Sequence, residues 1–314
     1  MGLTLGRLSQ ETKQTLLISV IFVVEFVIGG ILQPNFWTAG PLSFFLRNLS
    51  LMGILAIAQT LVILSGGIDM STGATYFFAS SICGWMTAIT GDFLLPIVAA
   101  LALGLVIGAV NGICIAKLRV PPIIATLGML IFLTGLAFVI IGPAPKGGAH
   151  PLLIEISRGG STYIWIGVAV LFLIISERTN FGWSIRAIGS NPIASQMSGI
   201  DVQTVRIWVY MISGLVSALA GLLYLGWAKT PFIVITVSAM GIDITIQSMA
   251  AVIIGGTLFL GGLGGFDRTL VGTLIAGTLF ALIRMFGFGQ EMITIVEGSF
   301  LVIIVYVYLR IYAR

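Results

Sequence analysis

The sequence predicts an all-α polytopic membrane protein that crosses the bilayer about ten times. Of its 314 residues, 58% are hydrophobic and 8% are charged, and the mean hydropathy is +1.14. A soluble domain carries about 25% charged residues, so this chain has too few charges to cover a water-exposed surface. The composition therefore excludes a soluble enzyme, a secreted disulfide scaffold and a disordered chain.

The predicted spans follow from the length of the apolar stretches, because a helix that crosses the hydrocarbon needs about 20 apolar residues. The chain holds ten such stretches, at 15–32, 42–64, 72–90, 94–116, 121–141, 161–176, 206–226, 243–260, 269–286 and 292–310. The first stretch is longer than the apolar region of a signal peptide, so we expect it to be a retained helix. The chain, 1–314, is then a single transmembrane domain.

The distribution of positive charge predicts the orientation. With the N-terminus in the cytoplasm, ten crossings leave ten Lys and Arg residues in cytoplasmic segments and three in external loops. Cationic loops resist translocation, so both termini are predicted to be cytoplasmic. The Lys and Arg residues never form a block, which argues against a nucleic-acid partner and leaves membrane lipid as the surrounding medium.

Small residues recur at helical spacing within two of the spans. Gly104, Gly108 and Gly112 form a GxxxGxxxG pattern, and Ser213, Ser217 and Gly221 repeat the same spacing. Lipid tails are as apolar as leucine, so helices in a bilayer associate through close approach of their backbones. Both patterns therefore predict faces of tight helix packing.

The segment LSGGIDMSTG (64–73) joins two spans with almost no hydrophilic loop. Gly66 and Gly67 permit a positive φ, so the first helix is expected to end there. Asp69 and Ser71 are then expected to cap the next helix. Two interpretations stay open: a capped turn at the cytoplasmic surface, or a broken helix that lines an aqueous cavity.

A short echo of this segment and a few buried polar residues bear on transport. Residues 241–245 resemble 67–71 and lie on the opposite side of the predicted topology, as an inverted repeat would place them. Neutral amides and hydroxyls within the spans suit an uncharged solute, although they also serve as contacts between helices. The role of Glu25 stays open. The candidate translocation path comprises Ser65, Gly66, Gly67, Asp69, Asn111, Thr126 and Gln247.

The longest predicted cytoplasmic loop, 177–205, contains a short helix within 189–200. Ser190 or Asn191 supplies its N-cap, Pro192 suits its first position, and Gly199 is placed to end it. So short a helix is marginal in water and needs a docking surface, either its own bundle or a groove on a soluble partner. The residues assigned to this docking are Asn191, Pro192, Ile193, Ala194, Met197, Gly199 and Ile200.

Motifs for catalysis are absent from the sequence. It contains no GxxxxGK[ST], HExxH or GxSxG pattern, and its only histidine and two cysteines form no cluster. We therefore predict that the chain is not an enzyme, has no catalytic or metal-binding residues and binds no cofactor.

Four stretches together resemble bacterial ABC-transporter permeases of the ribose/galactoside import class. They are LSGGIDMSTGA (64–74), PPIIATLGML (121–130), GSNPIASQMSGI (189–200) and AAVIIGGTLFLGGLGG (250–265). The resemblance implies a type II importer subunit with ten helices in the bacterial inner membrane. It implies a pore formed with a second permease, identical or paralogous, and a periplasmic or lipoprotein solute-binding protein. Cytoplasmic ATP-binding subunits would hold ATP and Mg²⁺ and receive residues 189–200 as a coupling helix.

The function implied by the resemblance is import of a sugar or sugar-like solute by alternating access. The pattern departs from the family around Ser71–Gly73 and over 241–249, so we expect the substrate gate to differ. Two alternatives stay open: an ABC permease for a non-sugar solute such as a branched-chain amino acid, and a stand-alone secondary transporter. The latter would need a site for a coupling ion.

Overall fold

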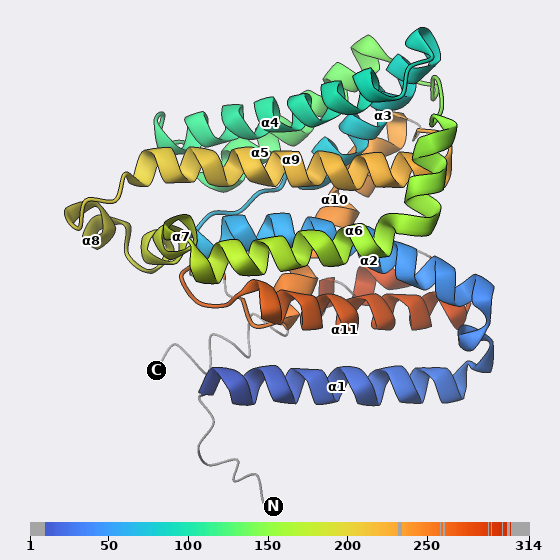
Figure 1. Ribbon diagram of the computed structural model, residues 1–314, viewed down its shortest axis with the longest axis horizontal. Coiled ribbons are helices and arrows are strands. Elements are labelled where there is room, and N and C mark those ends of the chain that lie inside the picture. The colour runs from blue at the N-terminus through green and yellow to red at the C-terminus, as the bar shows by residue number, and fades with distance from the viewer. Residues whose placement is uncertain are drawn as a thin grey trace, which may run out of the picture.

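Helices form most of the part of the chain that the computed structural model describes, which is residues 10–231, 234–257, 259, 261–287, 289, 291–296, 298, 299 and 302. The elements are α1 (Gln10–Leu32), the 3₁₀ helix η2 (Pro34–Trp37), α2 (Ala39–Leu64), α3 (Thr72–Thr90), α4 (Leu94–Ala116), α5 (Pro122–Ile140), α6 (Pro151–Arg178), α7 (Asn180–Ser190), α8 (Pro192–Met197), α9 (Val202–Ala228), α10 (Val234–Ile254) and α11 (Phe266–Met285) (Figure 1). No strand occurs among these residues, and the predicted all-α class is confirmed.

Six of these helices are long and apolar enough to cross a membrane, namely α2, α4, α5, α6, α9 and α11. Shorter apolar stretches lie in α1, at Phe22–Leu32, and in α10, at Gly241–Ile254. Helix α3 coincides with the predicted span 72–90. The predicted span 292–310 lies mostly outside the described residues, so the ten crossings and the internal repeat stay predictions.

The predicted span 161–176 was too short. Helix α6 has 28 residues and begins at Pro151. His150 is its N-cap, and Nδ1 of His150 accepts the N–H of Leu152 at 3.3 Å, while Pro151 occupies the first helical position. These local signals start the helix ahead of the strongly apolar stretch on which the prediction depended.

The predicted span 243–260 was placed too late in the chain. Helix α10 runs from Val234 to Ile254. The N–H of Gly256 bonds to the Ile253 carbonyl at 2.8 Å, and the N–H of Thr257 bonds to the Val252 carbonyl at 3.2 Å. Gly256 has a φ of +85°. This glycine-dependent C-terminal motif ends the helix although the residues that follow are still apolar.

Helix α2 is the centre of the bundle, because every residue from Leu49 to Leu64 is buried. Helices α6, α9, α10 and α11 pack around it, and α1 lies against α11 at one edge (Figure 1). Helices α4 and α5 form the opposite edge. Their outward side chains, such as Val106, Ile131 and Val139, are apolar and exposed, as lipid contact requires.

Helices α4 and α9 approach each other closely through small residues. A methyl group on Gly108 would overlap the carbonyl oxygen of Tyr210, and one on Gly104 would lie 2.5 Å from the carbonyl oxygen of Gly214. Further along α9, a methyl group on Gly221 would overlap the carbonyl oxygen of Tyr76 in α3. The predicted faces of tight helix packing are therefore confirmed.

We expect Gly108→Ala to lower the free energy of unfolding by about 1–3 kcal/mol, because the new methyl group forces α4 away from α9. The measurement is chemical denaturation of the detergent-solubilised chain. The matched control is Gly135→Ala in α5, where an added methyl group meets nothing within 4 Å. Equal unfolding free energies for the two variants would contradict close packing at Gly108.

Candidate functional site

Residues 65–71, between the end of α2 and the start of α3, form a non-helical segment that we call the break. A pair of glycines lies near its start. The N–H of Gly66 bonds to the Ile63 carbonyl at 2.9 Å, and the N–H of Gly67 bonds to the Val62 carbonyl at 3.0 Å. Gly66 has a φ of +77°, which a residue with a side chain rarely adopts. The prediction that α2 ends at these glycines is confirmed, and Gly66 supplies the left-handed conformation.

The carboxylate of Asp69 organises the residues after the break. Its side chain is 2% exposed. Oδ1 of Asp69 accepts the N–H of Ser71 at 2.9 Å and the Ser71 hydroxyl at 2.6 Å. Oδ2 accepts the hydroxyl of Ser213 in α9 at 3.1 Å. Asp69 is therefore bound to both the start of α3 and the middle of α9.

The prediction that the Ser71 side chain caps α3 was wrong. Ser71 occupies the N-cap position, but its side chain accepts no helix N–H. Its hydroxyl donates to Asp69 and accepts the amide of Asn111 in α4 at 2.9 Å. The N–H of Gly73, in the first turn of α3, is accepted instead by the hydroxyl oxygen of Thr245, 172 residues away in the sequence.

Further hydrogen bonds tie the break to helices α2, α5 and α10. The Gln59 amide donates to the Asp69 carbonyl at 2.8 Å, and the Thr126 hydroxyl oxygen accepts the N–H of Met70 at 3.0 Å. The Thr245 hydroxyl oxygen accepts the N–H of Gly73 at 3.0 Å. The segment is therefore held by five helices, α2, α4, α5, α9 and α10.

The start of α3, just after segment 67–71, lies in contact with the 241–245 echo. A methyl group on Gly73 would overlap the carbonyl oxygen of Gly241 and would lie 2.7 Å from Oγ1 of Thr245. This close approach brings the start of α3 against the middle of α10. Thr245 belongs to the 241–245 echo and forms its hydrogen bond to Gly73 at that contact.

Two separate cavities lie on either side of the break. The first is a groove of about 860 Å³ beside α8, lined in part by Ser65, Gly66, Gly67, Arg206 and Tyr210. The second, of about 480 Å³, lies among α2, α3, α9, α10 and α11. The two cavities share no lining residue. The chain passes from the groove at Gly67 to the second cavity at Tyr76.

The predicted path residues divide into three groups. Ser65, Gly66 and Gly67 line the groove, and Gln247 lines the second cavity. The remaining three are buried and hold the break instead of lining either cavity; they are Asp69, Asn111 and Thr126. The break is thus no simple surface turn: its first residues line a groove and its last are buried.

Sequence reasoning missed the aromatic residues of the second cavity. Its lining includes Phe44, Tyr76, Phe77, Tyr224 and Trp227. The only local signal is the spacing of Tyr224 and Trp227, which places both on one face of α9. The other rings come from α2 and α3, and no local pattern links them.

Among the described residues, no group of His, Cys, Asp and Glu could hold a metal ion.

Helix α8 confirms the short helix predicted within 189–200. Asn191 is its N-cap, and Oδ1 of Asn191 accepts the N–H groups of Ile193 at 3.1 Å and Ala194 at 3.0 Å. Gly199 follows with a φ of +85°. The Ile193 side chain is 73% exposed and that of Met197 is 85% exposed, so neither packs into the bundle of its own chain.

The residues around α8 also shape the groove. Of the predicted docking residues, Pro192, Ile193, Gly199 and Ile200 line it. Asp201 lines it as well and is the N-cap of α9, accepting the Thr204 hydroxyl at 2.6 Å. Hydrogen bonds from Thr204 hold the pKa of this exposed carboxyl below its usual range. Asp201 is therefore a charged acceptor at the rim of the groove.

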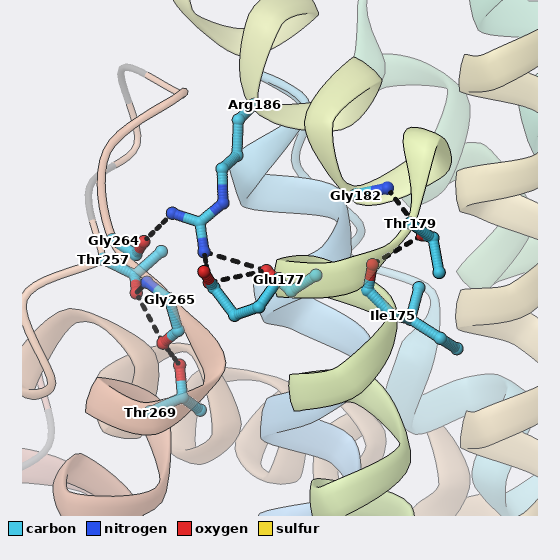
Figure 2. A network of polar contacts seen from close by, with 10 residues as sticks. Ile175, Glu177, Thr179, Gly182, Arg186, Thr257, Gly264, Gly265 and Thr269 are labelled. Carbon is cyan, nitrogen blue, oxygen red and sulfur yellow. Dashed lines mark hydrogen bonds and ion pairs between the residues drawn. The ribbon is translucent and has the colours of Figure 1, made fainter.

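Helix α7 anchors α8 to the bundle through Arg186 (Figure 2). The Arg186 guanidinium donates to the Gly264 carbonyl at 2.9 Å and to Glu177 of α6 at 2.6 Å. At the start of α7, the Thr179 hydroxyl oxygen accepts the N–H of Gly182 at 3.2 Å. Arg186 thus joins α7, the end of α6 and the loop before α11.

Close backbone contacts continue this link to the break. A methyl group on Gly189 in α7 would overlap the carbonyl oxygen of Leu64, the last residue of α2. The N–H of Gly262 donates to the same carbonyl at 3.0 Å. The end of α7, the end of α2 and the glycine-rich loop before α11 therefore meet without intervening side chains.

Comparisons with known proteins agree along most of the chain. A family model described as "Branched-chain amino acid transport system / permease component" matches residues 42–309. The chain is 32% identical to the ribose import permease RbsC of Escherichia coli K12, over 94% of this chain and 93% of that protein. No solved structure matches the chain significantly.

Two further relatives extend the comparison. The chain is 31% identical to the fructose import permease FrcC of Rhizobium meliloti, over 95% of this chain and 85% of that protein. It is 27% identical to the autoinducer 2 import system permease LsrD of Klebsiella pneumoniae, over 91% of this chain and 88% of that protein.

We expect Ser213→Ala to lower the free energy of unfolding by about 1–3 kcal/mol, because it leaves one oxygen of a buried carboxylate without its donor. Ser217→Ala is the matched control, since the Ser217 hydroxyl bonds to the Ser213 carbonyl of its own helix at 2.8 Å and to no other residue that the structure describes. Denaturation of both variants in one detergent measures the difference. If Ser217→Ala were as destabilising as Ser213→Ala, Asp69 would not be the centre of the network.

Proposed function

This chain belongs to the permease family whose model spans most of its length, and on that premise we propose that it is the translocation subunit of an ATP-driven ABC importer for a sugar or sugar-like solute. The observation that carries the proposal is the match to ribose and fructose import permeases over at least 94% of the chain. The relatives are permease subunits and not enzymes. Hydrolysis of ATP, with its Mg²⁺, belongs to a separate cytoplasmic subunit.

Helix α8 is the proposed contact with that ATP-binding subunit. It lies beyond the end of the bundle, and α7 lies between it and the other helices (Figure 1). Its exposed Ile193 and Met197 form an apolar knob that suits a groove on a partner. Arg178, which is also exposed, suits an acidic rim around that groove. Neighbouring exposed apolar side chains of this kind favour an interaction site.

Alternating access follows from the link between α8 and the break. Closure of the ATP-binding pair would move α8 and, through α7, the contacts of Arg186 and Gly189. Gly189 touches the end of α2, so the movement reaches the segment between the two cavities. Rearrangement of that segment would connect the second cavity to the groove and let the solute pass.

Membership in the family supports our proposal for the other partners and the location. A second permease, identical or paralogous, completes the pore, and a periplasmic or lipoprotein binding protein delivers the solute. The chain lies in the bacterial inner membrane, with α8 and both termini in the cytoplasm. A branched-chain amino acid is the alternative solute, because the description of the family names it.

We expect Ile193→Asp to abolish co-purification of the ATP-binding subunit and ATP-dependent uptake of D-ribose and D-fructose into proteoliposomes. The reason is that a carboxylate on the knob cannot be desolvated in an apolar groove. Membrane insertion should be unchanged, because Ile193 makes no contact with the core of its own chain.

Thr90→Asp is the control for this experiment, since it adds the same charge at an exposed site at the far end of α3. Retained co-purification of Ile193→Asp would refute α8 as the docking helix. Uptake that persists without the ATP-binding subunit, on a proton or sodium gradient, would refute the importer itself and favour a secondary transporter.

We also expect opposite labelling of two single cysteines in a chain without Cys83 and Cys114. Ser198→Cys, next to α8, should react with a membrane-impermeant maleimide only after spheroplasts are permeabilised. Asp92→Cys, in the exposed turn between α3 and α4, should react in intact spheroplasts. Labelling of Ser198→Cys in intact spheroplasts would invert the topology.

A further inference from the structure

We propose that the second cavity is a binding site for one neutral, sugar-sized solute, held by Asp243 and Gln247 against a wall of aromatic rings. The proposal rests on the proposed function, because it names the place where the imported solute is held. The volume, the rings and two unpaired polar side chains each support it.

The cavity has the size and position of a transport site. Its volume of about 480 Å³ lies within the range of about 300–1,000 Å³ that is usual for small-molecule sites. The first half of α2 lines it, together with the last turns of α9 and α11. It therefore lies at the end of the bundle away from α8, where a solute delivered from outside would arrive (Figure 1).

Five rings from three helices form a connected wall in this cavity. The Tyr224 ring centroid is 5.3 Å from that of Tyr76, 5.8 Å from that of Phe77 and 5.9 Å from that of Trp227. The Phe44 and Trp227 centroids are 5.8 Å apart. Ring faces carry partial negative charge, so they attract the weakly positive C–H groups on the faces of a sugar ring.

Arg47 fixes the orientation of the largest ring. Its guanidinium carbon lies 5.7 Å from the centroid of the Trp227 ring, which is a cation–π distance. A ring held in this way loses little freedom when a solute stacks on it. Trp227 is therefore the ring best prepared for stacking.

Two polar side chains of α10 line the cavity without a hydrogen-bond partner among the described residues. Asp243 and Gln247 are four residues apart, so they share one face of the helix. The Gln247 side chain is only 8% exposed, and neither residue hydrogen-bonds to any other residue that the structure describes. Their polar atoms are not among those that the structure buries without a partner, so they are open to the cavity, where the hydroxyl groups of a solute can hydrogen-bond to both.

The polar groups favour a sugar over a lipid tail. The Asn48 amide donates to the Phe44 carbonyl at 2.8 Å, which leaves its oxygen as a further acceptor at the cavity. A lipid chain would leave all three polar groups unpaired. A zwitterionic amino acid is tested separately, because the positive charge of Arg284, which also lines the cavity, would attract its carboxylate.

The test is saturation-transfer NMR on the full-length chain in nanodiscs, with D-ribose, D-fructose and L-leucine as probes. We expect transfer to the ring C–H protons of at least one sugar. Trp227→Leu and Gln247→Leu should each weaken binding about tenfold. Trp227→Phe keeps a ring and should retain most of the binding. Trp183→Leu removes an exposed tryptophan of α7, outside the cavity, and is the matched control.

The outcomes separate the site from the proposed function. Absence of transfer to both sugars, or transfer that survives Trp227→Leu and Gln247→Leu unchanged, would overturn the site even where ATP-dependent sugar uptake is intact. Transfer to leucine alone would overturn the solute class. Uptake that does not depend on ATP would instead refute the importer, whatever binds in the cavity.

Discussion

The structure depends on hydrogen bonding of the chain where α2 gives way to α3. Non-helical backbone at membrane depth is tolerated only where it is buried in protein or lines a water-filled cavity. Here the segment after Gly67 obtains its partners from five helices, with the Asp69 carboxylate at the centre. Because Asp69 is a buried acceptor with several donors, the arrangement of these helices is coupled to the conformation of the break.

Glycine connects this centre to the end of the molecule that carries α8. Where Gly189 meets Leu64 and Gly73 meets Gly241, backbones touch directly. Such contacts leave no compressible side chain between the elements, so a displacement of α7 is passed to α2 instead of being absorbed. The same small residues that replace the hydrophobic effect as the force between membrane helices thus also provide a stiff mechanical link.

The two cavities differ in chemistry in the way that the proposed transport cycle needs. The groove beside α8 is lined by charged residues such as Arg206 and Asp201. The cavity at the other end combines aromatic rings with a few polar groups, which suits transient binding of a hydroxylated solute. In the proposed cycle, the buried break would keep the two environments apart until α8 moves.

The sequence by itself determined the features that depend on composition and on near neighbours. Few charges and long apolar stretches predicted the membrane class, and the cap at Asn191 with Gly199 predicted α8, because these signals act within a few residues. Tertiary structure alone decided that Ser71 bonds to Asn111 instead of capping α3, and that Phe44, Tyr76 and Trp227 share one cavity. Those partners are far apart in the chain, and only the packing of the helices brings them together.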